Sequence, residues 1–178
     1  MVPSENLQPG QTLFQSRIFS IERCRYTDRN GDQHQRDIVR HPGSVVIVPF
    51  VDEKHVCLIR SFRLAVNDWL IELPAGTREP NEPALTTARR ELEEETGYRC
   101  DSMDAVQQFF PAPGILDENM HLFFARRLKP GPPRREPGEE IENLVLTWED
   151  ALDLVRRGEI RDAKTLIGLL LGSQRRTG

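Results

Sequence analysis

The sequence predicts one mixed α/β domain preceded by a small β extension, and three features of the 178-residue chain indicate this class. Short runs rich in β-branched residues, such as "SVVIVPFV" and "HVCLIRSF", are typical of buried strands. Segments with a helical period are interleaved with them, but without the regular rhythm of βαβ units. A chain of this length buries roughly 70% of its unfolded surface, which is enough for a stable core.

The predicted extension covers residues 1–42 and precedes a main domain at residues 43–178. Two segments between residues 13 and 40 have roughly alternating polar and apolar residues and are joined through "DRNGD". Asn30-Gly31 suits a tight turn that needs positive φ. We therefore expect an N-terminal β-hairpin.

Three strands and a helix are expected next. The strands are "SVVIVPFV", "HVCLIRSF" and "WLIELPAG", and Pro74 and Gly76 stop the last one. The helix is predicted at about residues 83–96, because Pro83 is tolerated in the first turn of a helix and Gly97 suits the position just after the last helical residue. Its apolar stripe consists of Ala84, Leu85, Ala88 and Leu92.

The remaining elements are three strands and two helices. "AVQQFFPAPG" and "MHLFFARRL" predict two strands, a Pro- and Gly-rich loop follows, and "NLVLTW" predicts the last strand. The helices are "EDALDLVRRG" and "DAKTLIGLLLG", and Thr147 with Asp150 three residues later is a candidate cap for the first.

Composition narrows the classes of function. A net charge of −4 with 38% hydrophobic and 29% charged residues indicates neither disorder nor a polyanion-binding surface, so no nucleic-acid partner is expected. The longest apolar run is too short to span a bilayer, and the N-terminus has no signal-peptide pattern, so no membrane partner is expected either. Cys24, Cys57 and Cys100 are widely spaced, which indicates reduced thiols and a cytoplasmic protein.

The predicted helix carries Glu91, Glu94 and Glu95 on one face, because their spacing places them within an arc of about 100°. Glu91 and Glu95 border the apolar stripe, where an unpaired carboxylate is costly. Arg90 supplies one compensating charge, and a hard divalent cation, Mg²⁺ or Mn²⁺, matches three carboxylates better. The alternative is a solvated acidic face, since "RRELEEE" is common on exposed helices.

The wider stretch resembles the box of the Nudix hydrolases, G-x5-E-x7-R-E-U-x-E-E-x-G-U, where U is bulky and apolar. The matching residues, in register, are Gly76, Glu82, Arg90, Glu91, Leu92, Glu94, Glu95, Gly97 and Tyr98. Only Tyr98 departs mildly, since aliphatic residues are commoner there. The resemblance implies an α/β/α sandwich with a mixed sheet, and metal-dependent hydrolysis of a nucleoside diphosphate linked to another moiety.

The same resemblance assigns roles inside the box. It implies that Glu91 and Glu95 are the main metal ligands, that Glu94 is a further one, and that the backbone carbonyl of Ala75 also binds metal. Arg90 is expected to orient the carboxylates. Glu82 is expected to brace the loop.

The flanking segments resemble ADP-ribose pyrophosphatases within this family. "SFRLAVNDWLIELPAG" precedes the box, "FFPAPGILDENMHLFFA" follows it, and Pro113 occupies a position where that subfamily has a proline. The implied reaction converts ADP-ribose, a small nucleoside diphosphate sugar, to AMP and ribose 5-phosphate. Ser61-Phe62 stands where Gln-Tyr is usual, and Ala112 lies inside "PAPG", so the purine and ribose pocket departs from the pattern.

The expected substrate-binding residues are Arg63, Gly76, Glu79 and Pro113. Arg63 matches an arginine that approaches the substrate phosphates, which suits a guanidinium; the alternative is a surface arginine. Glu79 is a candidate for the terminal ribose or simply an exposed loop glutamate. His121 is expected to be a packed strand histidine.

The water-activating base is expected in the loop "REPGEEIE", residues 135–142. The resemblance implies a glutamate on a mobile loop, and the candidates in order are Glu139, Glu140 and Glu136. For each, a solvated loop charge is the alternative. Without such a base, Glu94 becomes the candidate.

Other interpretations remain open. The protein could act on a different nucleotide sugar, such as GDP-mannose or an ADP-sugar, or on oxidised nucleotides, or it could be a non-catalytic sensor of nucleotide sugars. The resemblance also implies a homodimer in which residues 13–40 pack against or exchange with the partner. An isolated two-stranded ribbon is only marginally stable, which agrees with this expectation.

Overall fold

The computed structural model describes residues 7–135 and 137–175, and the chain divides into two compact units. The first unit comprises the described part of Met1–Gly43 together with Phe110–Asn119. The second comprises Ser44–Phe109 and the described part of Met120–Gly178. No helix in these described residues is long and apolar enough to cross a membrane.

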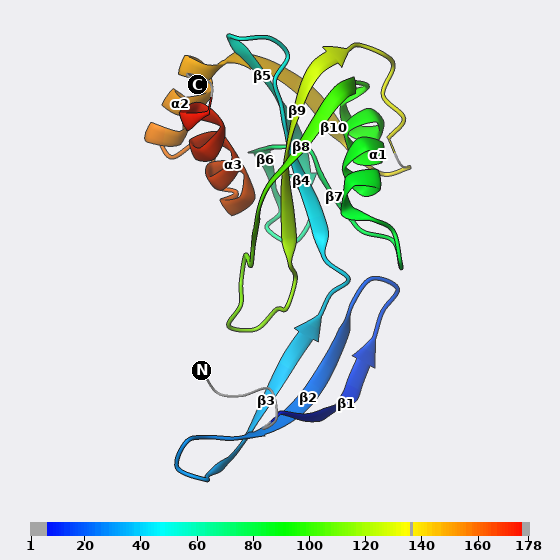
Figure 1. Cartoon of the computed structure of the whole chain (residues 1–178), viewed down its shortest axis with the longest axis vertical. Helices are drawn as coiled ribbons and strands as arrows, with labels where there is room; N and C mark the ends of the chain where they lie inside the picture. Colours follow the sequence, from blue (N-terminus) through cyan, green and yellow to red (C-terminus); the bar gives the residue numbers. More distant parts are fainter. Residues whose placement is uncertain (1–6, 136, 176–178) are drawn as a thin grey trace. The chain divides into compact units, whose positions relative to one another are not determined.

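The first unit contains an antiparallel sheet of β1 (Leu7–Gln15), β2 (Ser20–Thr27) and β3 (Gln33–Arg40), in that order (Figure 1). The turn between β2 and β3 falls at Asn30-Gly31, as predicted. The prediction of only two strands is wrong, because β1 adds a third. A register shift between Gln8 and Gln11 accommodates Pro9-Gly10, and β1 is an edge strand, where a proline is tolerated.

The second unit contains two sheets. A mixed sheet has the order β7-β4-β9-β8, formed by β4 (Ser44–Pro49), β7 (Ala75–Thr77), β8 (Arg99–Phe109) and β9 (Met120–Lys129). Within it, β4 and β9 are parallel and the other pairs are antiparallel. An antiparallel sheet has the order β10-β5-β6, formed by β5 (His55–Arg63), β6 (Asp68–Glu72) and β10 (Ile141–Thr147). The short strand β7 was not predicted, because Pro74 divides "WLIELPAG" into two strands.

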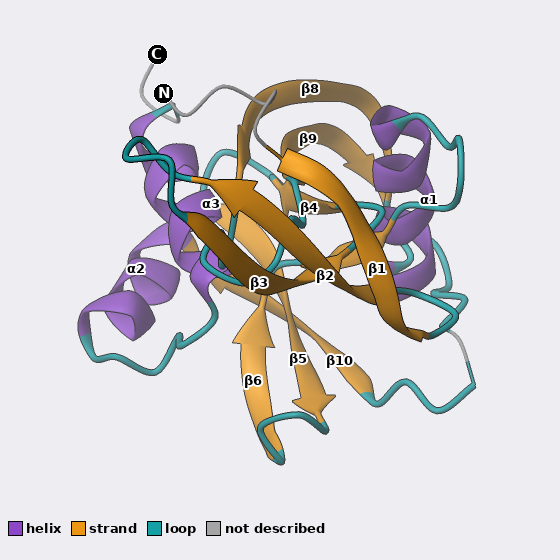
Figure 2. Ribbon diagram, turned by 90° about the horizontal axis from the view of Figure 1, so that it is seen from below, coloured by secondary structure: helices purple, strands orange, loops and turns teal. Residues whose placement is uncertain are grey.

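Helices cover both faces of the mixed sheet. The helix α1 (Ala84–Thr96) lies on one face, and α2 (Trp148–Arg156) and α3 (Ala163–Gln174) lie on the other (Figures 1 and 2). The alternating side chains of the central strand β4 face the two layers of helices. Val45 and Ile47 pack with α1, whereas Val46 and Val48 pack with α2 and α3. All four side chains are fully buried. The predicted α/β/α sandwich with a mixed sheet is confirmed.

The predicted helix boundaries agree closely with α1. The helix begins at Ala84, one residue after Pro83, and Gly97 ends it in the left-handed conformation with φ 78°. Ala88 and Leu92 are buried as expected, whereas Leu85 in the first turn is 44% exposed. The predicted cap of α2 is also confirmed, because the Thr147 hydroxyl accepts a hydrogen bond from the Asp150 N–H.

Candidate active site

Gly76 allows β7 and α1 to approach each other closely. A Cβ atom built on Gly76 would lie 2.0 Å from the carboxyl carbon of Glu91, so any larger residue would displace that carboxylate. Gly76 also pairs with Val45 on β4, which fixes the strand beneath the helix. The contact that the structure gives Gly76 is therefore with a predicted metal ligand.

Two carboxylates of α1 are largely buried. The Glu91 side chain is 13% exposed, and Glu95 is 5% exposed and accepts a hydrogen bond from the Ala75 N–H at 2.9 Å. Burial raises the pKa of Glu91 to about 7, with repulsion from Glu94 and Glu139 adding to the shift. Burial likewise raises the pKa of Glu95 to about 8, and Glu91 and Glu139 add to it. Negative charge is thus concentrated where little water can screen it.

Arg90 joins three carboxylates of the box. Its Nη1 donates to Glu91 Oε1 at 2.7 Å and to Glu94 Oε2 at 2.9 Å, and its Nη2 donates to Glu82 Oε2 at 3.2 Å. Glu82 Oε2 also accepts from the Thr87 hydroxyl at 2.9 Å, which ties the loop to the helix. These contacts agree with the expected roles of Arg90 in orienting the carboxylates and of Glu82 in bracing the loop.

The donor set fits a hard divalent cation, although the carboxylates are not gathered around one point. Among the described residues, no group of three or more His, Cys, Asp or Glu side chains is placed to hold a metal ion. Instead, one oxygen each of Glu91 and Glu94 meets Arg90, and one oxygen of Glu95 meets Ala75. Each carboxylate has a second oxygen, and buried carboxylates with raised pKa values gain from a nearby cation. The ligand set of Glu91, Glu94, Glu95 and the Ala75 carbonyl stays a prediction.

Arg63 ends β5, and its charge acts on the buried carboxylate of Glu95. Its Nε and Nη2 donate to the two oxygens of Glu72, each at 2.7 Å, while the Arg63 side chain is 41% exposed. Its positive charge acts on Glu95, where it opposes the rise of the pKa. A partly exposed guanidinium next to two buried carboxylates suits a phosphate, and this role also stays a prediction.

Two residues of this region were missed by the sequence analysis. Glu72 is 1% exposed, and Lys164 of α3 reaches its Oε2 with Nζ at 2.5 Å. The one available signal was a glutamate inside the apolar run "WLIELP", because a buried carboxylate requires a partner. Nothing in the sequence indicated which cation that partner would be.

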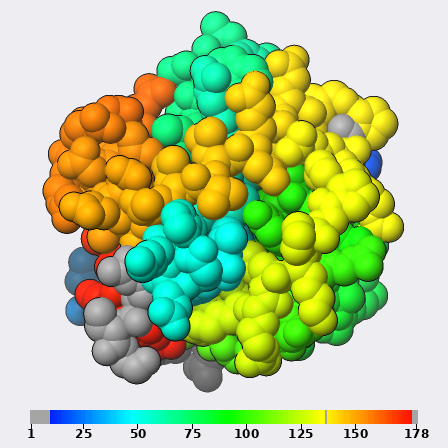
Figure 3. Space-filling view, turned by 90° about the horizontal axis from the view of Figure 1, so that it is seen from above, coloured from blue at the N-terminus to red at the C-terminus, as the bar shows by residue number. Residues whose placement is uncertain are grey.

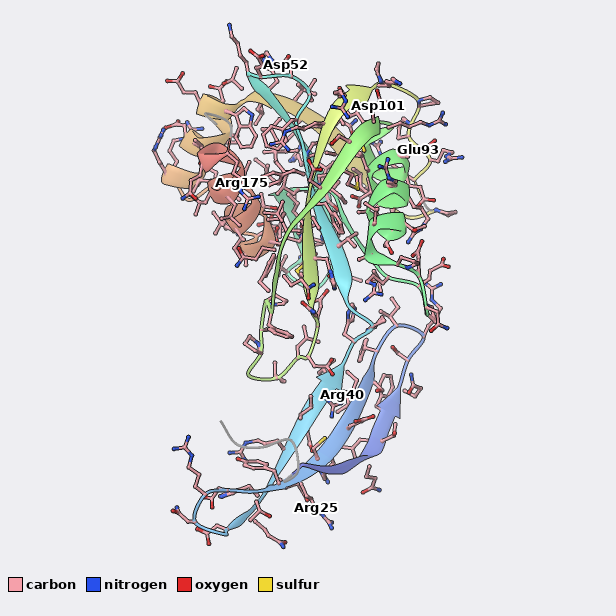
Figure 4. All side chains as sticks on the ribbon, viewed as in Figure 1. Arg25, Arg40, Asp52, Glu93, Asp101 and Arg175 are labelled. Atoms are coloured by element: carbon pink, nitrogen blue, oxygen red, sulfur yellow. The ribbon has the colours of Figure 1, made fainter. Side chains whose placement is uncertain are left out.

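The loop between β9 and β10 is tied to the end of α1. The Arg134 N–H donates to the Glu94 carbonyl at 2.8 Å, and Arg135 Nε donates to the Glu95 carbonyl at 3.1 Å. These carbonyls belong to the last helical turn, which lacks internal donors. Figure 3 shows this loop in yellow beside the green atoms of α1. Arg134 also forms an ion pair with Glu93 of α1, at 2.9 Å between Nη2 and Oε1; Glu93 is labelled in Figure 4.

The rest of this loop carries the candidates for the base. Glu139 is exposed, and its charge raises the pKa of both Glu91 and Glu95, so it lies near the buried carboxylates. Glu140 is also exposed, and its backbone carbonyl accepts from Phe62 N–H at 3.3 Å. Glu136 lies outside the described residues.

The remaining predicted residues have less distinctive surroundings. Glu79 is exposed, and its carbonyl accepts from the Glu82 N–H at 3.0 Å within the box loop. Pro113 is exposed in the segment 110–119, which belongs to the first unit. His121 lies in β9 and pairs with Val45, and burial lowers its pKa, as expected for a packed strand histidine.

Comparison with known proteins identifies the family. The family model for the NUDIX domain matches residues 40–167. The ADP-ribose pyrophosphatase of Bacillus subtilis (strain 168) is 40% identical over 138 residues, which cover 76% of this chain and 75% of that protein. The GDP-mannose pyrophosphatase of Cronobacter sakazakii (strain ATCC BAA-894) is 36% identical over 153 residues, which cover 79% of this chain and 80% of that protein.

A solved structure agrees in fold. The crystal structure of an ADP compounds hydrolase matches with a TM-score of 0.81 at 22% identity, over 94% of this chain and 91% of that chain. The chain belongs to the Nudix family, as the box residues predicted. Nudix hydrolases generally depend on a divalent metal ion, which agrees with the oxygen-rich donor set.

Proposed function

We propose that this protein hydrolyses the pyrophosphate bond of ADP-ribose to AMP and ribose 5-phosphate, with Mg²⁺ or Mn²⁺ as its cofactor. The observation that carries this proposal is the pair of largely buried carboxylates, Glu91 and Glu95, together with the partly exposed guanidinium of Arg63, whose charge acts on Glu95. This combination suits a metal-dependent reaction of a diphosphate. The 40% identity to an ADP-ribose pyrophosphatase supports the choice of substrate.

The metal would be held by Glu91, Glu95 and Glu94, together with the backbone carbonyl of Ala75. When bound, such an ion neutralises phosphate charge and makes a bound water more acidic. Arg90 keeps Glu91 and Glu94 oriented through its two short hydrogen bonds.

The chain itself supplies binding and proton transfer. Arg63 has five N–H donors, of which two meet Glu72, so further donors serve a substrate phosphate. We assign a contact with the terminal ribose to Glu79, and Pro113 stays a predicted substrate-binding residue. A water adds to one phosphorus, the bridging P–O bond breaks, and the proton that the water loses passes to a carboxylate, with Glu139 first and Glu140 or Glu94 next.

A second candidate function is hydrolysis of another nucleotide sugar. The 36% identity to a GDP-mannose pyrophosphatase favours GDP-mannose in particular, and ADP-sugars share the same diphosphate. A non-catalytic sensor is the more distant candidate. Retention of all the box carboxylates favours an enzyme over a sensor.

The test is a substrate panel with product analysis. Purified protein is incubated with ADP-ribose, GDP-mannose and ADP-glucose, in EDTA and then with excess Mg²⁺ or Mn²⁺. We expect equal amounts of AMP and ribose 5-phosphate from ADP-ribose, with activity lost in EDTA and restored by metal. Cleavage of GDP-mannose with ADP-ribose left intact would show that the proposed substrate is wrong, and binding without cleavage would favour the sensor.

We also propose that the protein works in the cytoplasm on small molecules rather than on nucleic acid or membranes. The three cysteines, Cys24, Cys57 and Cys100, are free, which suits a reducing compartment. The net charge of −4 does not favour a polyanionic partner.

A further inference from the structure

We infer that Lys164, in the first turn of α3, is a positioning residue for the substrate diphosphate. It holds and neutralises Glu72, so that Arg63 keeps both its orientation and its charge. The inference rests on the proposed role of Arg63, and it assigns a task at the active site to the C-terminal helix.

Glu72 is the centre of this arrangement. It ends β6 with 1% exposure, and Arg63 grips both of its oxygens at 2.7 Å in a bidentate pair, which fixes the plane of the guanidinium. Lys164 Nζ contacts Glu72 Oε2 at 2.5 Å and Asp162 Oδ2 at 3.0 Å. The carboxylate that orients Arg63 is therefore itself held by a second cation.

The charges explain why a second cation matters. Burial alone would raise the pKa of Glu72, but Arg63 and Lys164 together bring it below its ordinary value. Lys164 is only 12% exposed, so solvent screens its charge weakly. Lys164 shares its charge between Glu72 and Asp162, so it offsets part of the charge of Glu72 and leaves more of the Arg63 charge available to a phosphate. Without Lys164, the buried carboxylate would neutralise the guanidinium instead.

The first turn of α3 is rigidly attached at this point. The Asp162 side chain caps the helix by accepting from the Thr165 N–H at 3.0 Å. The Thr165 hydroxyl accepts from the backbone N–H of Leu73 at 2.7 Å, next to Glu72 in the chain. Lys164 thus lies next to Thr165, which ties α3 to the end of β6, and its Nζ also pairs with the capping Asp162; both contacts hold the ammonium group near the carboxylate.

A purely structural role is the competing explanation, since the same ion pair also attaches α3 to the sheet. The two explanations differ in their dependence on Arg63. A positioning residue affects ligand binding only while Arg63 is present, whereas a structural attachment weakens binding by the same factor with or without Arg63.

The test compares Lys164→Met with Lys164→Arg and with a Lys164→Met/Arg63→Met double variant. We measure KM and kcat for ADP-ribose, and the Kd of its non-cleavable α,β-methylene analogue by calorimetry with Mg²⁺. We expect Lys164→Met to raise KM and Kd about tenfold with kcat within about threefold, because Arg63 contacts substrate and transition state alike. In the Arg63→Met background, Lys164→Met should raise KM and Kd by less than about a further twofold. KM and Kd of Lys164→Arg should stay within about threefold of the wild-type values.

The matched control is Lys129→Met, which removes an exposed lysine paired with Asp101 in the same unit. It should leave KM and Kd unchanged. Should Lys164→Met fail to fold, alone or together with Arg63→Met, Lys164→Gln replaces it in both backgrounds. Glutamine keeps an N–H donor for Glu72 but carries no charge, so it is expected to weaken binding in the same way.

The inference is overturned if folded Lys164→Met, or Lys164→Gln in its place, binds the analogue like wild type. Equal weakening with and without Arg63 also overturns it. Failure of the proposed function looks different, since wild-type protein would then leave ADP-ribose intact. If it cleaves GDP-mannose instead, the same variants are compared by KM for that substrate, because the diphosphate is shared. Wild-type protein that neither cleaves these compounds nor binds the analogue would overturn both.

Discussion

At the scale of single residues, the candidate site holds acidic side chains close together in a largely buried position, which is energetically unfavourable. Glu91 and Glu95 are buried, repel neighbouring carboxylates and have pKa values raised to about 7 and about 8. The fold retains them despite a cost that a neutral residue would avoid. Residues kept at such a cost are typical of functional sites.

Replacing these carboxylates should therefore separate activity from stability. Glu91→Gln or Glu95→Gln should lower kcat on the order of 10³-fold or more, because each removes a charged ligand from a polyanionic metal site. The melting temperature in EDTA should stay the same or rise, since glutamine keeps the shape and removes the buried charge. Steady-state kinetics and thermal melting measure the two effects.

The control for this pair is Glu149→Gln, an exposed glutamate in the first turn of α2. It should keep the wild-type kcat. Near-normal turnover in both Glu91→Gln and Glu95→Gln would show that neither carboxylate serves the reaction.

At the scale of elements, the loop between β9 and β10 has two parts that differ in their contacts with α1. Its first part is tied to α1 through Arg134 and Arg135, whereas Glu139 and Glu140 follow Gly138, whose φ is 94°. The tie keeps the loop beside the helix that carries the predicted metal ligands. The side chains of Glu139 and Glu140 are exposed, and the Pro- and Gly-containing loop suits a movement that would bring one of them to a bound substrate.

The loop should supply the base. Among Glu139→Gln, Glu140→Gln and Glu136→Gln, we expect one to lower kcat at least about a hundredfold with little change in KM, as for loss of a general base. Glu139 is the first choice because its charge acts on both buried carboxylates. Glu142→Gln is the control, since Glu142 lies in β10, is 63% exposed and pairs with Arg60. Wild-type kcat in all three loop variants would place the base elsewhere, with Glu94 next.

For the whole molecule, the N-terminal sheet leaves large apolar side chains exposed. They are Leu13 at 42%, Phe14 at 50%, Ile18 at 45% and Phe19 at 36%. Clustered apolar side chains on a soluble protein often mark an interaction surface. These residues lie around the end of β1 and the start of β2, inside the segment 13–40 that is expected to meet a partner chain.

We therefore predict a homodimer that depends on this segment. Light scattering at micromolar concentration should give twice the chain mass of 20.5 kDa. Phe14→Glu/Ile18→Glu should give the monomer mass, because charges oppose burial in an apolar interface. Val145→Glu, at an exposed position of the second unit, should remain dimeric. A monomeric wild-type protein would refute the prediction.

Local spacing was sufficient to predict the box helix and the face on which its carboxylates lie. The helical period places Glu91, Glu94 and Glu95 on one face wherever the helix lies, and Gly97 ends that helix in any context. The caps of α1 and α2 and most strands follow from short-range preferences in the same way. Membership of the Nudix family could therefore be predicted from a single contiguous stretch of residues.

Contacts between segments that are far apart in the sequence could not be predicted from it. Lys164 meets Glu72 across 92 residues, and the sequence contains no signal that selects one cation as the partner of one buried carboxylate. The strands β1 and β7 were missed because Pro9-Gly10 and Pro74 oppose strand formation locally, while pairing with β2 and β4 overrides that preference. Such pairings depend on which surfaces the packed core brings together, and that is a property of the folded chain rather than of any short stretch.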